Sequence, residues 1–176
     1  MRQKLSLLEQ LKIFKGRQPI VPHIGHKTAF RIEKRRASDP TIIDVDEWVG
    51  NVGLNEGINL LASLLCGGSG TPYDSSYAYL GVGDSSITEA AGQTGLQASS
   101  NKAWAGMESG YPIYGSDQQI VFRSVFGSGE ANFPWEEFTV GNSNDDSGEN
   151  LLRATSSRGT KVDGDSWTLN VTVTFS

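Results

Sequence analysis

Two histidines and one cysteine are the first residues of this chain to suggest metal or nucleophile chemistry. His23 and His26 stand three positions apart, but no Cys, Asp or Glu close by completes a tetrahedral zinc set. Cys66 would need a histidine partner and a lowered thiol pKa to act as a nucleophile. It also follows a predicted helix, whose C-terminal end disfavours a thiolate. We therefore expect ordinary arm histidines and a buried structural cysteine.

Two adjacent acids, Glu136 and Glu137, form the next candidate pair. Neighbours on a strand point to opposite faces of a sheet, so these two side chains cannot flank one bond as paired catalytic carboxylates. We expect one of them to face solvent. The other should pair with a cation such as Arg123 or Arg153.

Two further motifs resemble ligand loops but lack required residues. Aligning the acidic stretch 142–149 to a calcium loop puts Ala154 where the bidentate Glu belongs, which predicts a solvated turn. Gly81-Val-Gly83 follows a predicted strand, but position 86 is Ser and no helix follows, so it is no phosphate-binding glycine loop. The sequence therefore predicts a protein that is not an enzyme, with no catalytic residue, no cofactor and no metal site.

Charge is divided unevenly along the 176 residues. Residues 1–36 hold ten of the fifteen Lys and Arg against two acids, a net charge of +8, whereas residues 37–176 carry −13. Such asymmetry is typical of a separate interaction segment attached to a folded body. The single cysteine excludes an intrachain disulfide and favours a reducing compartment. No run approaches the ~20 apolar residues of a membrane span, and the N-terminal stretch is interrupted by charges, unlike a signal peptide.

The basic segment reads as a short helix followed by an extended arm. Apolar residues at helical spacing predict an amphipathic helix over residues 3–15, too short to be stable without a surface to lie on. Residues 17–40 contain three prolines and no periodicity. We therefore expect an N-terminal arm over 1–40 and a β-rich body over 41–176. The arm residues expected to contact a partner are Leu7, Leu11, Phe14, Arg17, Arg31, Lys34, Arg35 and Arg36.

The arm mixes basic with apolar residues, which suits a protein surface, above all an acidic one. Docking on its own acidic body is the alternative. Nucleic acid and membrane are disfavoured as partners, because the charges are spaced among Pro, Ile, Val and Phe and only 33–36 is a dense cluster.

The body carries the pattern of a β protein with one helix. Asn51 is the expected N-cap of a helix that ends near Cys66 and packs its apolar side chains across a sheet. The fold class is mainly β, an antiparallel β-sandwich or barrel with one packed helix and an extended N-terminal arm. Strands are predicted at 41–49, 77–82, 117–126 and 135–140, then a C-terminal hairpin of 151–162 and 166–176 around an Asp163-Gly164 turn.

Three groups of segments resemble a recurrent family of tailed-bacteriophage virion structural proteins. The resemblance covers about residues 45–176 and depends on the order and spacing of the segments. They are NVGLNEGINLLA at 51–62, AYLGVGD at 78–84 with TGLQ at 94–97, and VFRSVFGSGEANFPWEE at 121–137 with NLLRAT at 150–155, GTK at 159–161 and WTLNVTVTF at 167–175.

The resemblance implies a virion part, most simply a capsid cement or decoration protein. Such a protein would clamp neighbouring major capsid subunits through its arm and stabilise the head, and we expect it to self-associate as a dimer or trimer. Its expected place is the outer capsid surface of the virion, and the host cytoplasm during assembly. Two alternatives stay open: a tail, neck or baseplate component, and a carbohydrate-binding β module that uses Trp104, Tyr111 and Tyr114 of the long 84–117 loop as stacking platforms.

Overall fold

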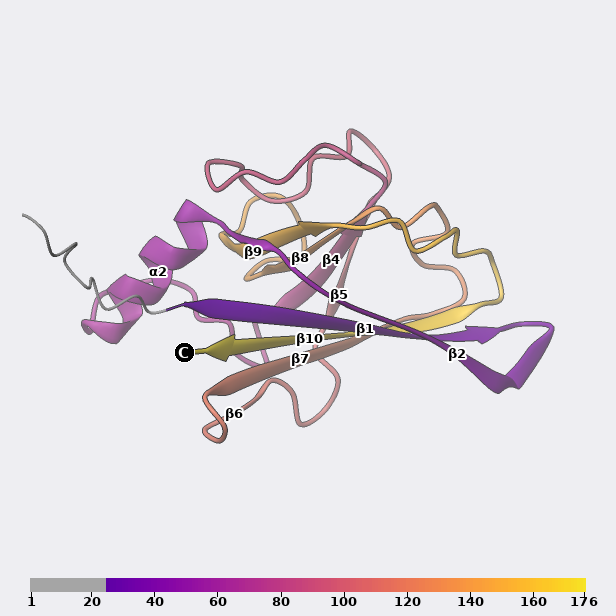
Figure 1. Ribbon diagram of the computed structural model, residues 1–176, viewed down its shortest axis with the longest axis horizontal. Coiled ribbons are helices and arrows are strands. Elements are labelled where there is room, and N and C mark those ends of the chain that lie inside the picture. Colours follow the sequence, from indigo (N-terminus) through magenta and orange to yellow (C-terminus); the bar gives the residue numbers. More distant parts are fainter. Residues whose placement is uncertain (1–24) are drawn as a thin grey trace, which may run out of the picture.

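Two antiparallel sheets face each other in the computed structural model, which describes residues 25–176 (Figure 1). Within that range each sheet has five strands, and the predicted mainly β fold with two packed antiparallel sheets and one helix is confirmed. Sheet A runs in the order β2 (Asp39–Val49), β1 (His26–Arg36), β10 (Ser166–Phe175), β7 (Gln119–Phe126) and β6 (Ile113–Tyr114). Sheet B runs β3 (Val52–Gly53), β9 (Asn150–Thr155), β8 (Glu137–Gly141), β4 (Tyr79–Gly83) and β5 (Lys102–Gly106).

Strand β1 corrects the domain boundary expected after residue 40. It lies between β2 and β10 and pairs antiparallel with both. The physical reason is a strand alternation of buried and outward residues, which the many charged residues make hard to see in the sequence. Thr28, Phe30 and Ile32 are buried, while the residues between them face outward or lie only partly covered. Residues 26–40 are therefore part of the body. The remainder of the expected arm, with Leu7, Leu11, Phe14 and Arg17, lies outside the described residues.

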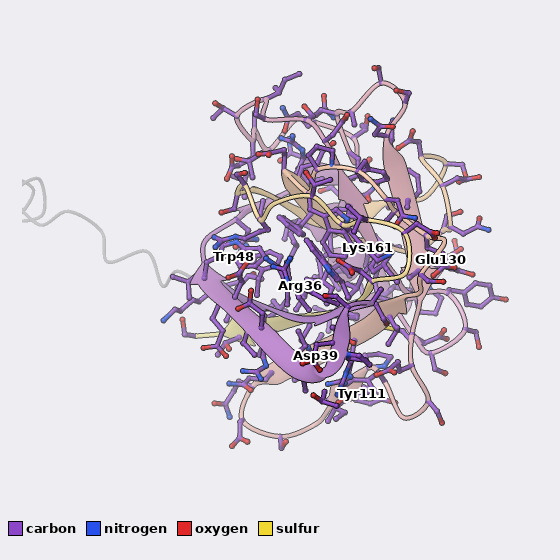
Figure 2. The ribbon with its side chains drawn as sticks, turned by 90° about the vertical axis from the view of Figure 1, so that its right-hand side faces the viewer. Arg36, Asp39, Trp48, Tyr111, Glu130 and Lys161 are labelled. Atoms are coloured by element: carbon purple, nitrogen blue, oxygen red, sulfur yellow. The ribbon has the colours of Figure 1, made fainter. Side chains whose placement is uncertain are left out.

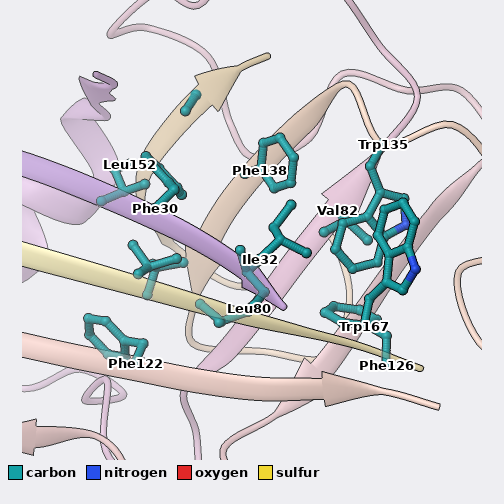
Figure 3. Packing of buried hydrophobic residues seen from close by; sticks show 14 of the residues in the cluster. Phe30, Ile32, Leu80, Val82, Phe122, Phe126, Trp135, Phe138, Leu152 and Trp167 are labelled. Carbon is teal, nitrogen blue, oxygen red and sulfur yellow. The ribbon is translucent and has the colours of Figure 1, made fainter. Parts of the chain in front are cut away.

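Aromatic side chains from both sheets fill the space between them (Figure 3). Phe30 stacks on Trp48 with ring centroids 4.8 Å apart, and Trp135 meets Phe126 and Trp167 edge-on at 4.9 and 4.8 Å. These are the preferred aromatic geometries and add to the stabilisation from area burial. Since Phe30 comes from β1, the core requires that strand.

The last strand has the alternation that its sequence predicts, but the predicted hairpin of 151–162 with 166–176 is wrong. Trp167, Leu169, Val171 and Val173 are all buried, with threonines and Asn170 between them. Strand β10, however, has β1 and β7 on its two sides, and β9 belongs to sheet B. Residues 156–165 therefore carry the chain from one sheet to the other.

The helix, α2 (Asn55–Leu65), begins three residues later than predicted. Asn51 is not its cap, because Val52–Gly53 first pair with β9 as β3, and the N-cap is Leu54 without a side-chain hydrogen bond. A Cβ at Gly57 would lie 2.3 Å from the Leu151 backbone, so this glycine permits the close approach of α2 to β9. Of the helix residues only Gly57 and Leu60 are buried, and Cys66 is exposed, contrary to expectation.

Two truncations test the position of β1. Removing residues 1–24 should leave a body that unfolds in one cooperative transition, since the described core is made from residues 25–176. Removing residues 1–36 should abolish the cooperative transition. Loss of Phe30 and Ile32 alone would cost roughly 2–5 kcal/mol each, against a typical total stability of about 5–15 kcal/mol. Thermal unfolding followed by circular dichroism checks both, and a folded 37–176 fragment would contradict the assignment.

Candidate interaction surface

The hairpin of β1 and β2 joins a basic strand to an acidic one. Ion pairs link Arg31 to Glu47 at 2.5 Å, Lys34 to Asp46 at 2.5 Å and Arg36 to Asp44 at 3.8 Å. Figure 2 shows Asp39 at the turn of this hairpin and Trp48 toward its other end. Much of the charge asymmetry seen in the sequence is thus neutralised inside one hairpin.

Lys34 is the arm residue whose expected role the structure overturns. It is buried, and its Nζ donates to Asp46 and to the backbone oxygen of Arg158 at 2.7 Å while lying 4.7 Å from the centroid of the Trp167 ring. A buried ammonium satisfied in this way has no surface left for a partner. By contrast Arg31, Arg35 and Arg36 are exposed.

The outer face of sheet A carries a small apolar row beside a charged one. Strand register aligns Val49, Ala29, Thr172 and Val121 across four strands. The neighbouring row contains Arg31 paired with Glu47, and a broad open hollow lies over both rows. A shallow mixed surface of this kind suits protein contact better than capture of a small ligand.

Strand β2 forms one edge of sheet A and is the longest edge strand among the described residues. It spans 11 residues and has only β1 beside it. Ile43, Val45 and Val49 on this strand are 39, 39 and 61 % exposed. An edge strand presents unpaired backbone groups that another strand can pair with, and exposed β-branched residues favour such pairing. The β2 edge is therefore the strongest interaction candidate within residues 25–176.

On the opposite sheet, Glu137 and Arg153 form a fully buried ion pair. Glu137 Oε2 accepts from Arg153 Nε at 2.8 Å, and the backbone N–H groups of Gln97 and Ala98 also donate to the carboxylate. A Cβ at Gly83 would lie 2.4 Å from Glu137 Oε1, so the second glycine of the Gly81-Val-Gly83 motif makes room for the carboxylate. The pair thereby fastens the 84–101 loop onto sheet B and confirms that one acid of 136–137 pairs with Arg153.

Asp145 of the acidic 142–149 stretch and Lys161 also have structural partners. The Asp145 carboxylate accepts hydrogen bonds from Ser143 and Ser147, which lower its pKa and close the 142–149 stretch as an exposed turn. Burial lowers the pKa of Lys161, whose Nζ donates to Gly127 O at 2.6 Å and Asn132 Oδ1 at 2.9 Å. These groups organise loops.

Of the two histidines, His26 is among the described residues and His23 lies outside them. His26 is exposed, and its Nε2 lies 3.2 Å from the Asn51 amide nitrogen. Within 25–176, no three His, Cys, Asp or Glu side chains gather as a possible metal group. No helix in that range is long and apolar enough to cross a membrane.

The three aromatic residues of the 84–117 loop do not share one surface. Tyr111, Pro112 and Tyr114 line a hollow with Asp74 and Ser75, and Tyr114 is 73 % exposed. Trp104 instead packs over Gly81 of the neighbouring strand with its indole nitrogen buried. Two of the three predicted stacking residues therefore remain candidates.

Comparisons with known proteins give no relative. No protein-family model matches the sequence, and neither a curated protein nor a solved structure matches it significantly. The resemblance to phage virion proteins therefore stays a prediction from the residues.

The buried ion pair gives a stability prediction with a matched control. Glu137→Gln should destabilise the protein by about 3–5 kcal/mol, because it leaves the Arg153 guanidinium buried without its counter-charge. Glu136→Gln should cost under about 1 kcal/mol, since that carboxylate is half-buried and accepts from the exposed Ser157 hydroxyl. Urea unfolding measures both variants, and equal losses would show that the pair does not hold the loop.

Proposed function

We propose that this chain is a structural protein of a tailed-bacteriophage virion, and within it a capsid cement protein that clamps neighbouring major capsid subunits. The observation that carries the proposal is the position of β1. The basic residues 1–24 lead directly into a strand that is paired on both sides along most of its length. A clamp needs such a firm attachment, because contacts made by the N-terminal segment hold the protein in place only if tension on that segment is transmitted to the folded body.

The strand geometry suits a clamp mechanically. Tension along β1 would load the ladders to β2 and β10 in shear, so many backbone hydrogen bonds resist together. If β1 lay at a sheet edge, one ladder would carry the load. A shell protein under internal pressure benefits from this difference, and the repeated sites of a capsid lattice multiply weak contacts.

Within this proposal residues 1–24, rather than the cations of β1, make the main contacts with the capsid. Residues 1–24 hold five Lys and Arg against one Glu, a net charge of +4. Three of the five β1 cations are already paired with β2 acids, so Leu7, Leu11, Phe14 and Arg17 are the better partner-binding candidates. An acidic, grooved face of the major capsid protein would complement them. The β2 edge would serve self-association as a dimer or trimer around local capsid symmetry.

Binding to purified phage heads tests the clamp. The full chain should co-sediment with heads, more weakly as salt rises, because charge contacts are screened. The 25–176 truncation should lose binding, while Arg35→Gln with Arg36→Gln in the full chain should retain most of it. Undiminished binding of the truncated body would contradict the clamp. Electron microscopy of labelled virions would locate the chain, and density on the tail, neck or baseplate would favour that alternative.

A second candidate function, saccharide binding, is favoured by the hollow at Tyr111 and Tyr114. An exposed aromatic ring can stack on a sugar, and the neighbouring carboxylate of Asp74 can accept hydrogen bonds from the sugar hydroxyls. Tyr114→Ala should then abolish glycan-array signals while stability stays unchanged. Val162→Ala, an exposed apolar change in another loop, serves as the control. An array without signal for the unaltered protein would discard this function.

A further inference from the structure

Helix α2 has a second apolar stripe, which the described residues leave uncovered. Ile58, Ala62 and Leu65 stand at helical spacing, and all three are exposed, with Ile58 at 44 % and Leu65 at 87 %. The opposite side of the helix is already packed through Gly57 and Leu60. An apolar stripe on a short surface helix is normally covered by another element.

The chain enters the described body beside this stripe. Gly25 pairs with Ser176 through both backbone groups, at 2.8 and 3.0 Å. The next residue, His26, lies close to Gly53, and so does Ile58 of α2. A Cβ on that glycine would be 2.8 Å from the His26 ring and 3.5 Å from Ile58 Cδ1. Figure 1 shows the start of β1 next to α2. Residues preceding Gly25 therefore begin near the N-terminal half of α2.

The length of the preceding chain is sufficient to reach the whole stripe. The predicted amphipathic helix over 3–15 is separated from Gly25 by nine residues, which span up to about 30 Å when extended. An 11-residue helix such as α2 is about 16 Å long. The predicted helix can therefore lie along α2 in either direction.

The apolar stripes of the two helices have the same length. Leu7, Leu11 and Phe14 are separated by four and three positions, and so are Ile58, Ala62 and Leu65. With the two stripes aligned in either direction, two large side chains meet at each end. Leu11 then faces the small Ala62, as close helix packing requires.

Charge also favours docking. The last turn of α2 has no basic residue to complement the partial negative charge of its carbonyl end. Docking brings two cations to that end, Arg2 and Lys4 in one direction or Lys12 and Lys15 in the other. The other two cations then lie toward Glu56, the acid in the first turn of α2.

We propose that residues 3–15 dock on the Ile58/Ala62/Leu65 stripe of α2 in the same chain. This inference concerns the free protein and does not depend on the proposed function. If both hold, docking keeps Leu7, Leu11 and Phe14 out of water until a capsid surface competes for them.

Cys66 gives a direct test, because it is the only cysteine, is exposed in residues 25–176 and follows Leu65 at the end of the stripe. Residues at one end of the docked helix cover Cys66. The rate of its reaction with Ellman's reagent should therefore be at least about tenfold slower in the full chain than in the L7S/L11S variant, since labelling follows the undocked population. The L5S/I13S variant, altered on the other side of the predicted helix, should react as slowly as the unaltered chain.

Three results would overturn the proposal. One is an equal labelling rate for the unaltered chain and L7S/L11S in native buffer. Another is equal acceleration by L5S/I13S. The third is protection that disappears on dilution, which would assign the stripe to a second copy. The variant I58S/L65S alters the α2 stripe instead of the docking segment, and its Cys66 should also react faster. Samples unfolded in urea give the maximum labelling rate for every variant.

Discussion

The pairing of β1 with both β2 and β10 is the constraint on which the rest of sheet A depends. It supplies Phe30 and Ile32 to the core, places Lys34 under the Trp167 ring and lines up the ion pairs across the hairpin. It also sets where the preceding residues leave the body, beside α2 and next to Ser176. Packing, charge and the direction of the basic segment therefore follow from one strand.

Charge in this protein has two different uses. In the β1–β2 hairpin and at Glu137–Arg153, opposite charges fix one strand or loop against another, so they specify internal geometry. Residues 1–24 carry a net charge of +4. Within residues 25–176, the ion pairs of the hairpin neutralise part of the charge that the sequence shows.

Periodicity predicted the fold class, and its failures have physical causes. The Trp167–Phe175 alternation located β10, because one face of that strand is buried and the other is not. The same period in β1 was concealed, since Lys34 occupies a buried position and the outward residues are Arg and Glu. The Asp163-Gly164 sequence predicts only a local turn. The strands that pair with β10, which are β1 and β7, are determined by the packing of the whole sheet. Glu137 could be predicted to have a cationic partner, but its two backbone donors come from a loop that no sequence pattern places.

Register between β1 and β10 has a consequence for how the chain acquires its structure. His26 pairs with Phe175, so sheet A joins residues almost a full chain length apart. On a ribosome, β1 and β2 can form a hairpin early, yet Phe30, Ile32 and Trp48 stay uncovered until β10 emerges. Sheet A can therefore form completely only after β10 has been synthesised. Until then the apolar face of the β1–β2 hairpin stays exposed, which makes the unfinished chain prone to aggregation.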